Sequence, residues 1–75
     1  MSPVTASDIR DILSRLSISQ SEFARRTHVH RSYVTQLLNG ARTNPSKLYA
    51  EQVAKICREN SLDDIAERIE QRIEK

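Results

Sequence analysis

The sequence predicts an all-α fold, a compact domain of five short helices, and three observations lead to this class. Apolar residues recur three and four positions apart in several segments, which is the spacing of one helical face. Residues that commonly cap helices stand at the starts of these segments. One glycine and two prolines among 75 residues leave little turn chemistry for a sheet. A chain of this length supports a single core, and hence one domain.

The first two helices are predicted from apolar periodicity and from serine caps. The first begins after Ser7, the expected N-cap, and presents one apolar face. The residues of this face are Ile9, Ile12, Leu13 and Leu16. The second begins at Ser19, because Ser19 and Glu22 have the spacing of a capping box, in which each side chain accepts a hydrogen bond from the backbone amide of the other residue. We expect it to end near Thr27.

Two further helices are predicted on either side of the glycine. The third runs from Arg31 to about Asn39, and Gly40 is free to take the left-handed conformation that ends many helices. We expect Asn44 to cap the fourth helix and Pro45 to occupy its first position, where a missing amide hydrogen does no harm. Their apolar positions are Val34, Leu37, Leu38, Leu48, Val53, Ile56 and Cys57.

A fifth helix is predicted over about 61–74, after the fourth ends near Asn60. Ser61 is its expected cap, with the acid Asp64 three residues on. Its apolar residues repeat at helical spacing and are Leu62, Ile65, Ala66, Ile69 and Ile73. Because no repeat, low-complexity run or linker divides the chain, we expect residues 1–75 to form a single domain.

The positive charge is concentrated in the middle of the sequence. Residues 15–47 have a net charge of +5, whereas residues 1–14 and 48–75 carry −1 and −2, which together give the +2 of the whole chain. A basic segment between acidic ends favours a surface that binds a polyanion. A solvated basic surface is the alternative, and it applies in particular to Arg25 and Arg26, which either approach phosphate or only face water.

Several classes of function are disfavoured by composition. A single cysteine excludes an internal disulfide and favours a reducing compartment, so we expect a cytoplasmic protein. No apolar run is long enough for a membrane helix, and Met1–Ser7 does not have the pattern of a signal peptide. Two histidines, His28 and His30, lack further ligands at suitable spacing, so no metal or other cofactor is expected. No paired titratable groups indicate an enzyme.

The third predicted helix has more polar positions than its packing needs. With three core contacts, it leaves a broad face on which five of its side chains lie: Arg31, Ser32, Tyr33, Thr35 and Gln36. Arginine, glutamine, serine and threonine are types that reach base edges, and the major groove admits one α-helix. This face therefore indicates contact with double-stranded DNA.

The segment around this helix resembles the helix-turn-helix of the lambdoid phage repressor and Cro proteins, the Xre-like family. The match covers roughly residues 7–60, with the motif at about 20–40. It consists of Gln20-Ser21-Glu22-Phe23-Ala24, Val29, Ser32-Tyr33-Val34-Thr35-Gln36-Leu37-Leu38-Asn39-Gly40 and Pro45. One departure is His28, where the family usually has a glycine with positive φ; histidine is among the residues enriched in that conformation. The resemblance implies a repressor-like domain.

Site residues follow from this resemblance and from the positions of polar side chains. The family's base-reading positions correspond to Arg31, Ser32 and Gln36, and Thr35 lies beside them. Arginine can grip a guanine and glutamine an adenine. Contacts to phosphate, which position a protein without reading sequence, are expected on both sides of this helix. The expected backbone-contacting residues are Gln20, Tyr33, Asn39, Arg42, Asn44 and Lys47.

The C-terminal helix is the expected surface for a second subunit. Ile73 lies close to the chain end, where little remains to cover it, and Ile69 and Tyr49 are the other candidates. The alternative is that these side chains complete the core of one chain. The resemblance implies homodimers on two-fold operators, since one recognition helix alone reads few base pairs.

These observations predict a sequence-specific transcriptional regulator, a Cro-like repressor of a phage, plasmid or mobile-element operon acting at the nucleoid. Its expected partner is an operator in double-stranded DNA, with no small-molecule ligand. Two alternatives stay open: an antitoxin that autoregulates its operon, and a helical adaptor that binds a protein and not DNA. Salt dependence separates DNA binding from an apolar adaptor interface, because only phosphate neutralisation releases counterions.

Overall fold

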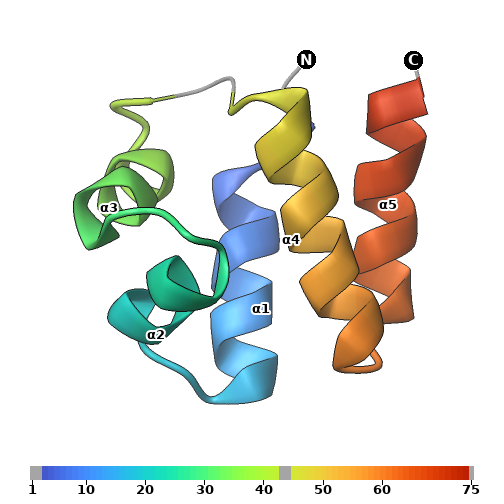
Figure 1. Cartoon of the computed structure of the whole chain (residues 1–75), viewed down its shortest axis with the longest axis horizontal. Helices are drawn as coiled ribbons and strands as arrows, with labels where there is room; N and C mark the ends of the chain where they lie inside the picture. The colour runs from blue at the N-terminus through green and yellow to red at the C-terminus, as the bar shows by residue number, and fades with distance from the viewer. Residues whose placement is uncertain (1–2, 43–44, 75) are drawn as a thin grey trace.

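Five helices pack around one core in the computed structural model, which describes residues 3–42 and 45–74 (Figure 1). In chain order they are α1 (Ala6–Leu16), α2 (Gln20–Arg26), α3 (Arg31–Asn39), α4 (Lys47–Glu59) and α5 (Asp63–Glu74). No strand occurs within these two ranges. The predicted all-α class, with five helices, is therefore confirmed.

Helix α1 lies between two helix pairs, with α2 and α3 on one side and α4 and α5 on the other (Figure 1). All five helices contribute buried side chains. The largest that are fully buried are Ile9, Ile12, Phe23, Val34, Val53, Cys57, Ile65 and Ile69. Burial raises the pKa of the Cys57 thiol to about 11, so it stays protonated and packs as a small apolar group. The core thus holds the α2–α3 pair against α1, α4 and α5.

The start of α1 differs from the prediction, because Thr5 and not Ser7 is the N-cap. The Thr5 hydroxyl oxygen accepts a hydrogen bond from the Asp8 amide at 3.1 Å, and the Asp8 carboxylate accepts one from the Thr5 amide at 3.0 Å. This reciprocal pair is a complete capping box. Thr5 competes successfully with Ser7 because only Thr5 has an acid three residues later.

Helix α2 begins at Ser19 as predicted, although only half of the expected capping box forms. The Ser19 hydroxyl oxygen accepts from the Glu22 amide at 3.1 Å. The Glu22 carboxylate instead pairs with Arg25 and Arg26, at 2.6 and 2.8 Å. Two guanidinium groups within one helical turn are stronger partners for a carboxylate than one backbone amide.

The start of α4 also differs from the prediction. Ser46 is the N-cap, with its hydroxyl oxygen accepting from the Tyr49 amide at 3.1 Å, so Pro45 precedes the helix and does not occupy its first position. Asn44, the expected cap, lies outside the described residues. A serine and an asparagine cap equally well, and the sequence alone did not separate them.

Three helices end in the same way, on a residue in the left-handed conformation other than glycine. These residues are Ser17, His28 and Ser61, with φ of 53°, 60° and 62°. In each case the next residue is apolar, and its amide donates to the carbonyl oxygen five residues earlier: Ile18 to Leu13, Val29 to Ala24, and Leu62 to Cys57. This is the Schellman motif, which satisfies carbonyls at a helix end. Ser61 therefore ends α4, and the prediction that it caps α5 is wrong.

A buried ion pair ties the N-terminal end of α1 to α5. The Asp8 side chain is 4% exposed and accepts hydrogen bonds from Thr5 and from the Arg72 guanidinium, and Arg68 lies 3.6 Å away. The Arg72 guanidinium also donates to the Pro3 carbonyl at 3.4 Å. The buried carboxylate thus has partners from the N-cap of α1 and from α5, which fixes α5 against the start of α1.

Candidate nucleic-acid interface

The α2–turn–α3 unit has a tight turn between two short helices. Ala24 is 2% exposed and lies where a larger side chain would separate the helices from the core. His28, with φ of 60°, has the positive φ expected at this position of the motif, and Val29 bonds back to Ala24 at 3.0 Å. The turn therefore forms without glycine, because histidine tolerates the left-handed region better than most residues.

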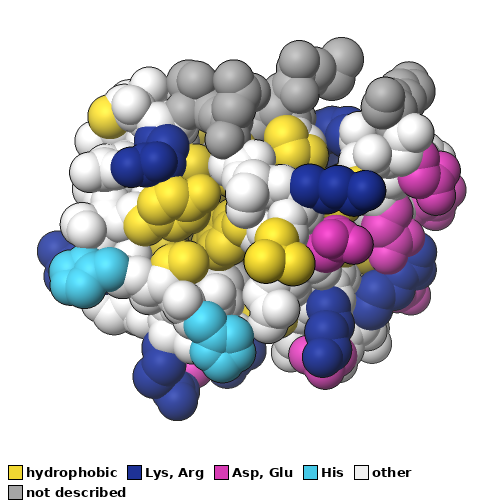
Figure 2. Space-filling view, turned by 45° about the horizontal axis from the view of Figure 1, so that its top comes forward, with side chains coloured by type: hydrophobic (Ala, Val, Ile, Leu, Met, Phe, Trp, Pro, Cys, Tyr) yellow, Lys and Arg dark blue, Asp and Glu magenta, His cyan; other side chains and the backbone are white. Residues whose placement is uncertain are grey.

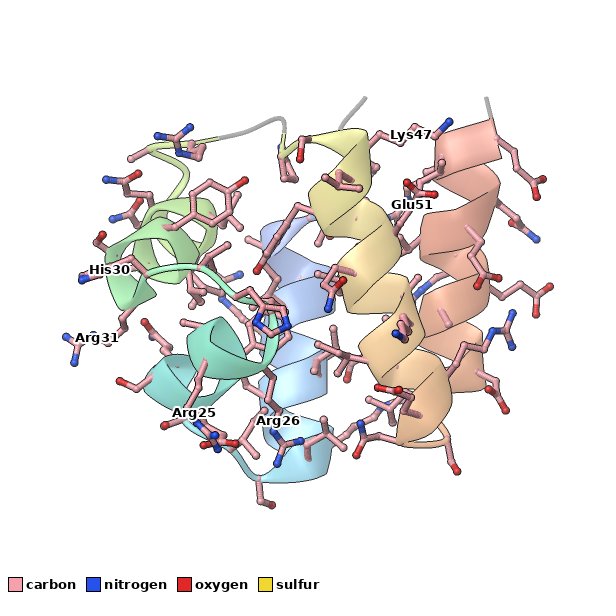
Figure 3. The ribbon with its side chains drawn as sticks, viewed as in Figure 1. Arg25, Arg26, His30, Arg31, Lys47 and Glu51 are labelled. Atoms are coloured by element: carbon pink, nitrogen blue, oxygen red, sulfur yellow. The ribbon has the colours of Figure 1, made fainter. Side chains whose placement is uncertain are left out.

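Helix α3 has a buried and an exposed face. Val34 and Leu37 are buried, and Leu38 packs against the core from its edge. The four predicted base-reading residues lie on the opposite side, where with His30 they line one hollow: Arg31, Ser32, Thr35 and Gln36. Figure 3 shows His30 and Arg31 pointing away from the body of the protein. The structure thus brings these four residues together, and their contact with bases stays a prediction.

Gln20, at the first position of α2, is hydrogen-bonded to Thr35 on the exposed face of α3. The Thr35 hydroxyl donates to the Gln20 side-chain oxygen at 2.9 Å. This bond uses the carbonyl side of the amide, so both N–H donors of Gln20 stay available for a phosphate oxygen. It also fixes α2 and α3 relative to each other at the side that faces outward.

A second cluster joins α3 to the loop that follows it and consists of Tyr33, Gln36 and Arg42. The Arg42 guanidinium lies over the Tyr33 ring, 5.0 Å from its centroid, and its Nε donates to the Gln36 side-chain oxygen at 3.2 Å. The Arg42 amide donates to the Gln36 carbonyl at 3.1 Å. A cation over an aromatic face is held in place without losing its charge. Arg42 is therefore held beside the predicted base-reading residues, and its contact with phosphate stays a prediction.

The Tyr33 ring rests on Tyr49, which in turn contacts the turn of the motif. The two rings meet edge to face, with centroids 5.1 Å apart. The Tyr49 and Thr27 hydroxyl oxygens are 3.1 Å apart, and since the Thr27 hydroxyl donates to the Phe23 carbonyl, Tyr49 is the donor between them. Burial raises the pKa of Tyr49 to about 12, so its hydroxyl keeps this proton. Tyr33 is thus supported from α4.

The side of the molecule formed by α2 and α3 differs in charge from the side formed by α4 and α5. Glu22 is the one acid within residues 20–42, and it pairs with Arg25 and Arg26. Hydrogen bonds from these two arginines lower the pKa of Glu22. Within the described ranges no ion pair engages Arg31 or Arg42. In Figure 2 acidic side chains gather on the right, over α4 and α5, together with basic ones, whereas the charged and histidine side chains on the left are mainly Lys or Arg and His.

The remaining predicted phosphate contacts are not all near α3. Asn39 is exposed, and its side-chain oxygen accepts from the Ala41 amide at 2.9 Å, which orders the loop after the recognition helix. Lys47 lies on the side of α4 that faces α5, away from His30 and Arg31 (Figure 3), and lines a different hollow. Asn44 lies outside the described residues. Asn39 thus lies beside α3 and Lys47 does not, and contact of either residue with phosphate stays a prediction.

The predicted dimer residues differ in accessibility. Ile69 is fully buried and Tyr49 is 6% exposed, so both complete the core of the single chain. Of the two expectations for these side chains, burial favours the core of one chain over a subunit surface, because Ile69 has no exposed area and Tyr49 has little. Ile73 is partly buried and lines the hollow between α4 and α5, where it stays accessible.

His30 is a residue of this surface that the sequence analysis did not assign. It is the N-cap of α3, and its ring nitrogen Nδ1 accepts from the Ser32 amide at 3.2 Å. Histidine is not among the preferred N-cap residues, which explains why composition gave no signal. Its place immediately before the first base-reading residue was the clue available.

Two short helices around a tight turn, with an exposed polar and basic face on the second, define a helix-turn-helix DNA-binding domain. A family model described as helix-turn-helix, HTH_3, matches residues 9–69. The chain belongs to this family of Xre- and Cro-type domains, which bind DNA, regulate transcription and are not enzymes. Neither the curated proteins nor the solved structures gave a match. Over the residues described, no helix has the length and apolarity to cross a membrane.

Proposed function

We propose that the protein is a repressor that reads a palindromic operator as a homodimer. The observation that carries this is the hollow on α3, where Arg31, Ser32, Thr35 and Gln36 lie together on one face. Arg31 has no acid partner in the described chain and is free to grip guanine. The Gln36 oxygen accepts from Arg42 but keeps a second lone pair, so its amide still suits adenine.

A selected duplex provides the test. Duplexes with a randomised centre are selected on the wild-type protein, and the strongest is used to compare Arg31→Ala with wild type. Loss of a bidentate contact lowers affinity by about 1–3 kcal/mol and relaxes the preference at one base pair. Arg58→Ala is the matched control, since Arg58 carries the same charge near the far end of α4 and pairs with Asp63 and Glu70. Equal binding by Arg31→Ala and the control contradicts the assignment.

The dimer surface that we propose is the hollow between α4 and α5. Ala54 and Ile73 supply its apolar lining, and the charged residues around it are Lys47, Glu51, Lys55, Glu70 and Glu74. Side chains of both charges are present, so a second copy related by a two-fold axis can place its basic side chains against the acidic side chains of the first. A self-complementary patch of this kind is what an isologous interface requires. Two recognition helices then read half-sites about 10 base pairs apart.

Ile73→Glu tests this interface, because Ile73 is accessible and its replacement adds a like charge beside Glu70 and Glu74. We expect the helical circular dichroism to be kept while sedimentation shows more monomer and operator affinity falls. Gln71→Glu is the matched control, since Gln71 is exposed on α5 and does not line the hollow. A folded Ile73→Glu variant that sediments and binds as wild type places the interface elsewhere.

A further inference from the structure

His30 makes two contacts to Ser32 through a single ring nitrogen. Its Nδ1 lies 3.2 Å from the Ser32 amide nitrogen and 2.9 Å from the Ser32 hydroxyl oxygen. A backbone amide can only donate, so the cap requires a lone pair on Nδ1 and places the proton of the neutral ring on Nε2. In this state the Ser32 hydroxyl also directs its hydrogen toward Nδ1, and its lone pairs face outward.

Protonation of the ring reverses this arrangement. The imidazolium carries hydrogens on both nitrogens, so Nδ1 can no longer accept from the Ser32 amide. It can instead donate to the hydroxyl oxygen, which already lies 2.9 Å away. The hydroxyl hydrogen is then released outward. Ser32 therefore presents an acceptor when His30 is neutral and a donor when His30 is charged.

We propose that His30 sets the hydrogen-bonding sense of Ser32 and thereby makes base preference at one position depend on pH. Histidine is the side chain that exchanges its proton between pH 5 and 8. An acceptor at Ser32 favours the amino groups of adenine or cytosine, whereas a donor favours the guanine or thymine oxygens. His30 acts through Ser32 and is a positioning residue; this inference rests on the proposed DNA-binding face.

The charged side chains of the elements next to His30 lie on α3 and on α2, which packs against α3. Arg31 lines the same hollow, and α2 contributes Arg25, Arg26 and Glu22, which pair with one another. In the described part of the chain no carboxylate forms an ion pair with His30. His30 is exposed, so protons reach it without any movement of the fold.

The first experiment needs no DNA. Nuclear magnetic resonance of the full chain between pH 5 and 8 follows the His30 ring nitrogens and the Ser32 amide. We expect the Ser32 amide to shift together with His30 protonation in wild type and in His28→Gly, which removes the other imidazole. In His30→Asn, whose side-chain oxygen also caps a helix but does not titrate, we expect no such shift. A Ser32 amide that ignores His30 overturns the proposal.

The second experiment uses a library of duplexes with a randomised centre, selected at pH 6 and at pH 8. We expect one position in each half-site to change from adenine or cytosine at pH 8 toward guanine or thymine at pH 6, by about 3- to 10-fold, the ordinary effect of one hydrogen bond. His30→Asn should keep one preference at both pH values. A change that persists in His30→Asn, or its absence in wild type, refutes the switch. Failure to enrich any duplex refutes the DNA-binding face itself.

Discussion

Ser61→Gly should stabilise the protein, although it removes a side chain and adds no contact. Ser61 has φ of 62°, is exposed, and ends α4 through its left-handed backbone. A Cβ in this conformation costs about 1–2 kcal/mol. Glycine loses about 0.4–1 kcal/mol of that gain through its greater freedom in the unfolded chain. We therefore expect unfolding to require about 0.5–1 kcal/mol more, and Tm to rise by about 3–6 °C in a domain of this size.

Gly40→Ala is the reverse substitution and serves as the control. Gly40 has φ of 82°, and a Cβ built there would meet nothing within 4 Å, so the substitution tests the torsional cost without a clash. It should lower stability by about 1 kcal/mol. Both variants are compared with wild type by thermal and urea unfolding followed by far-UV circular dichroism. If Ser61→Gly proves no more stable than wild type while Gly40→Ala is neutral, backbone strain does not decide stability at these helix ends.

Two further predictions concern the ion pairs. Arg72→Ala should lower the free energy of unfolding by about 2–3 kcal/mol, because it removes a partner of the buried Asp8. Arg68→Ala should lower it by less, since Arg68 is half exposed and lies 3.6 Å from Asp8. Urea unfolding measures both changes. Hydrogen bonding from Arg58 lowers the pKa of Glu70 below 4.5, so its contribution to stability is present above that pH and is lost as the pH falls through the lowered value. Glu70→Gln should therefore reduce the acid sensitivity of Tm, and an unchanged pH profile would show that this pair contributes nothing.

The helices and the exposed face of α3 were predictable because they depend on spacing. Val34 and Leu37 are buried and Arg31 is exposed, as the period of 3.6 residues requires. The positive φ of His28 was predictable as well, because the motif position imposes it. Local periodicity and a motif in register were sufficient for these features.

The helix ends were not predictable at the same level, because several residues compete for each role. Ser61 has a hydroxyl suited to a cap, yet it lies where the chain must reverse between α4 and α5, and the reversal requires a left-handed residue. Ile69 belongs to a periodic apolar face, but periodicity does not tell a core side chain from a subunit contact. Only the packing of α5 against α4, together with its ion pair to Asp8 of α1, resolves this.

The separation of charge between the two sides of the molecule has a consequence for the first encounter with DNA. Arg31 and Arg42 carry uncompensated charge on the side of α3, whereas α5 presents acids such as Glu67 and Glu74. In the field of a polyanion such a molecule experiences a torque as well as an attraction, and it turns α3 toward the duplex before any base is touched. Collisions at random sequence then already have the orientation that the base contacts proposed for α3 need, and the protein moves along the duplex with α3 toward it.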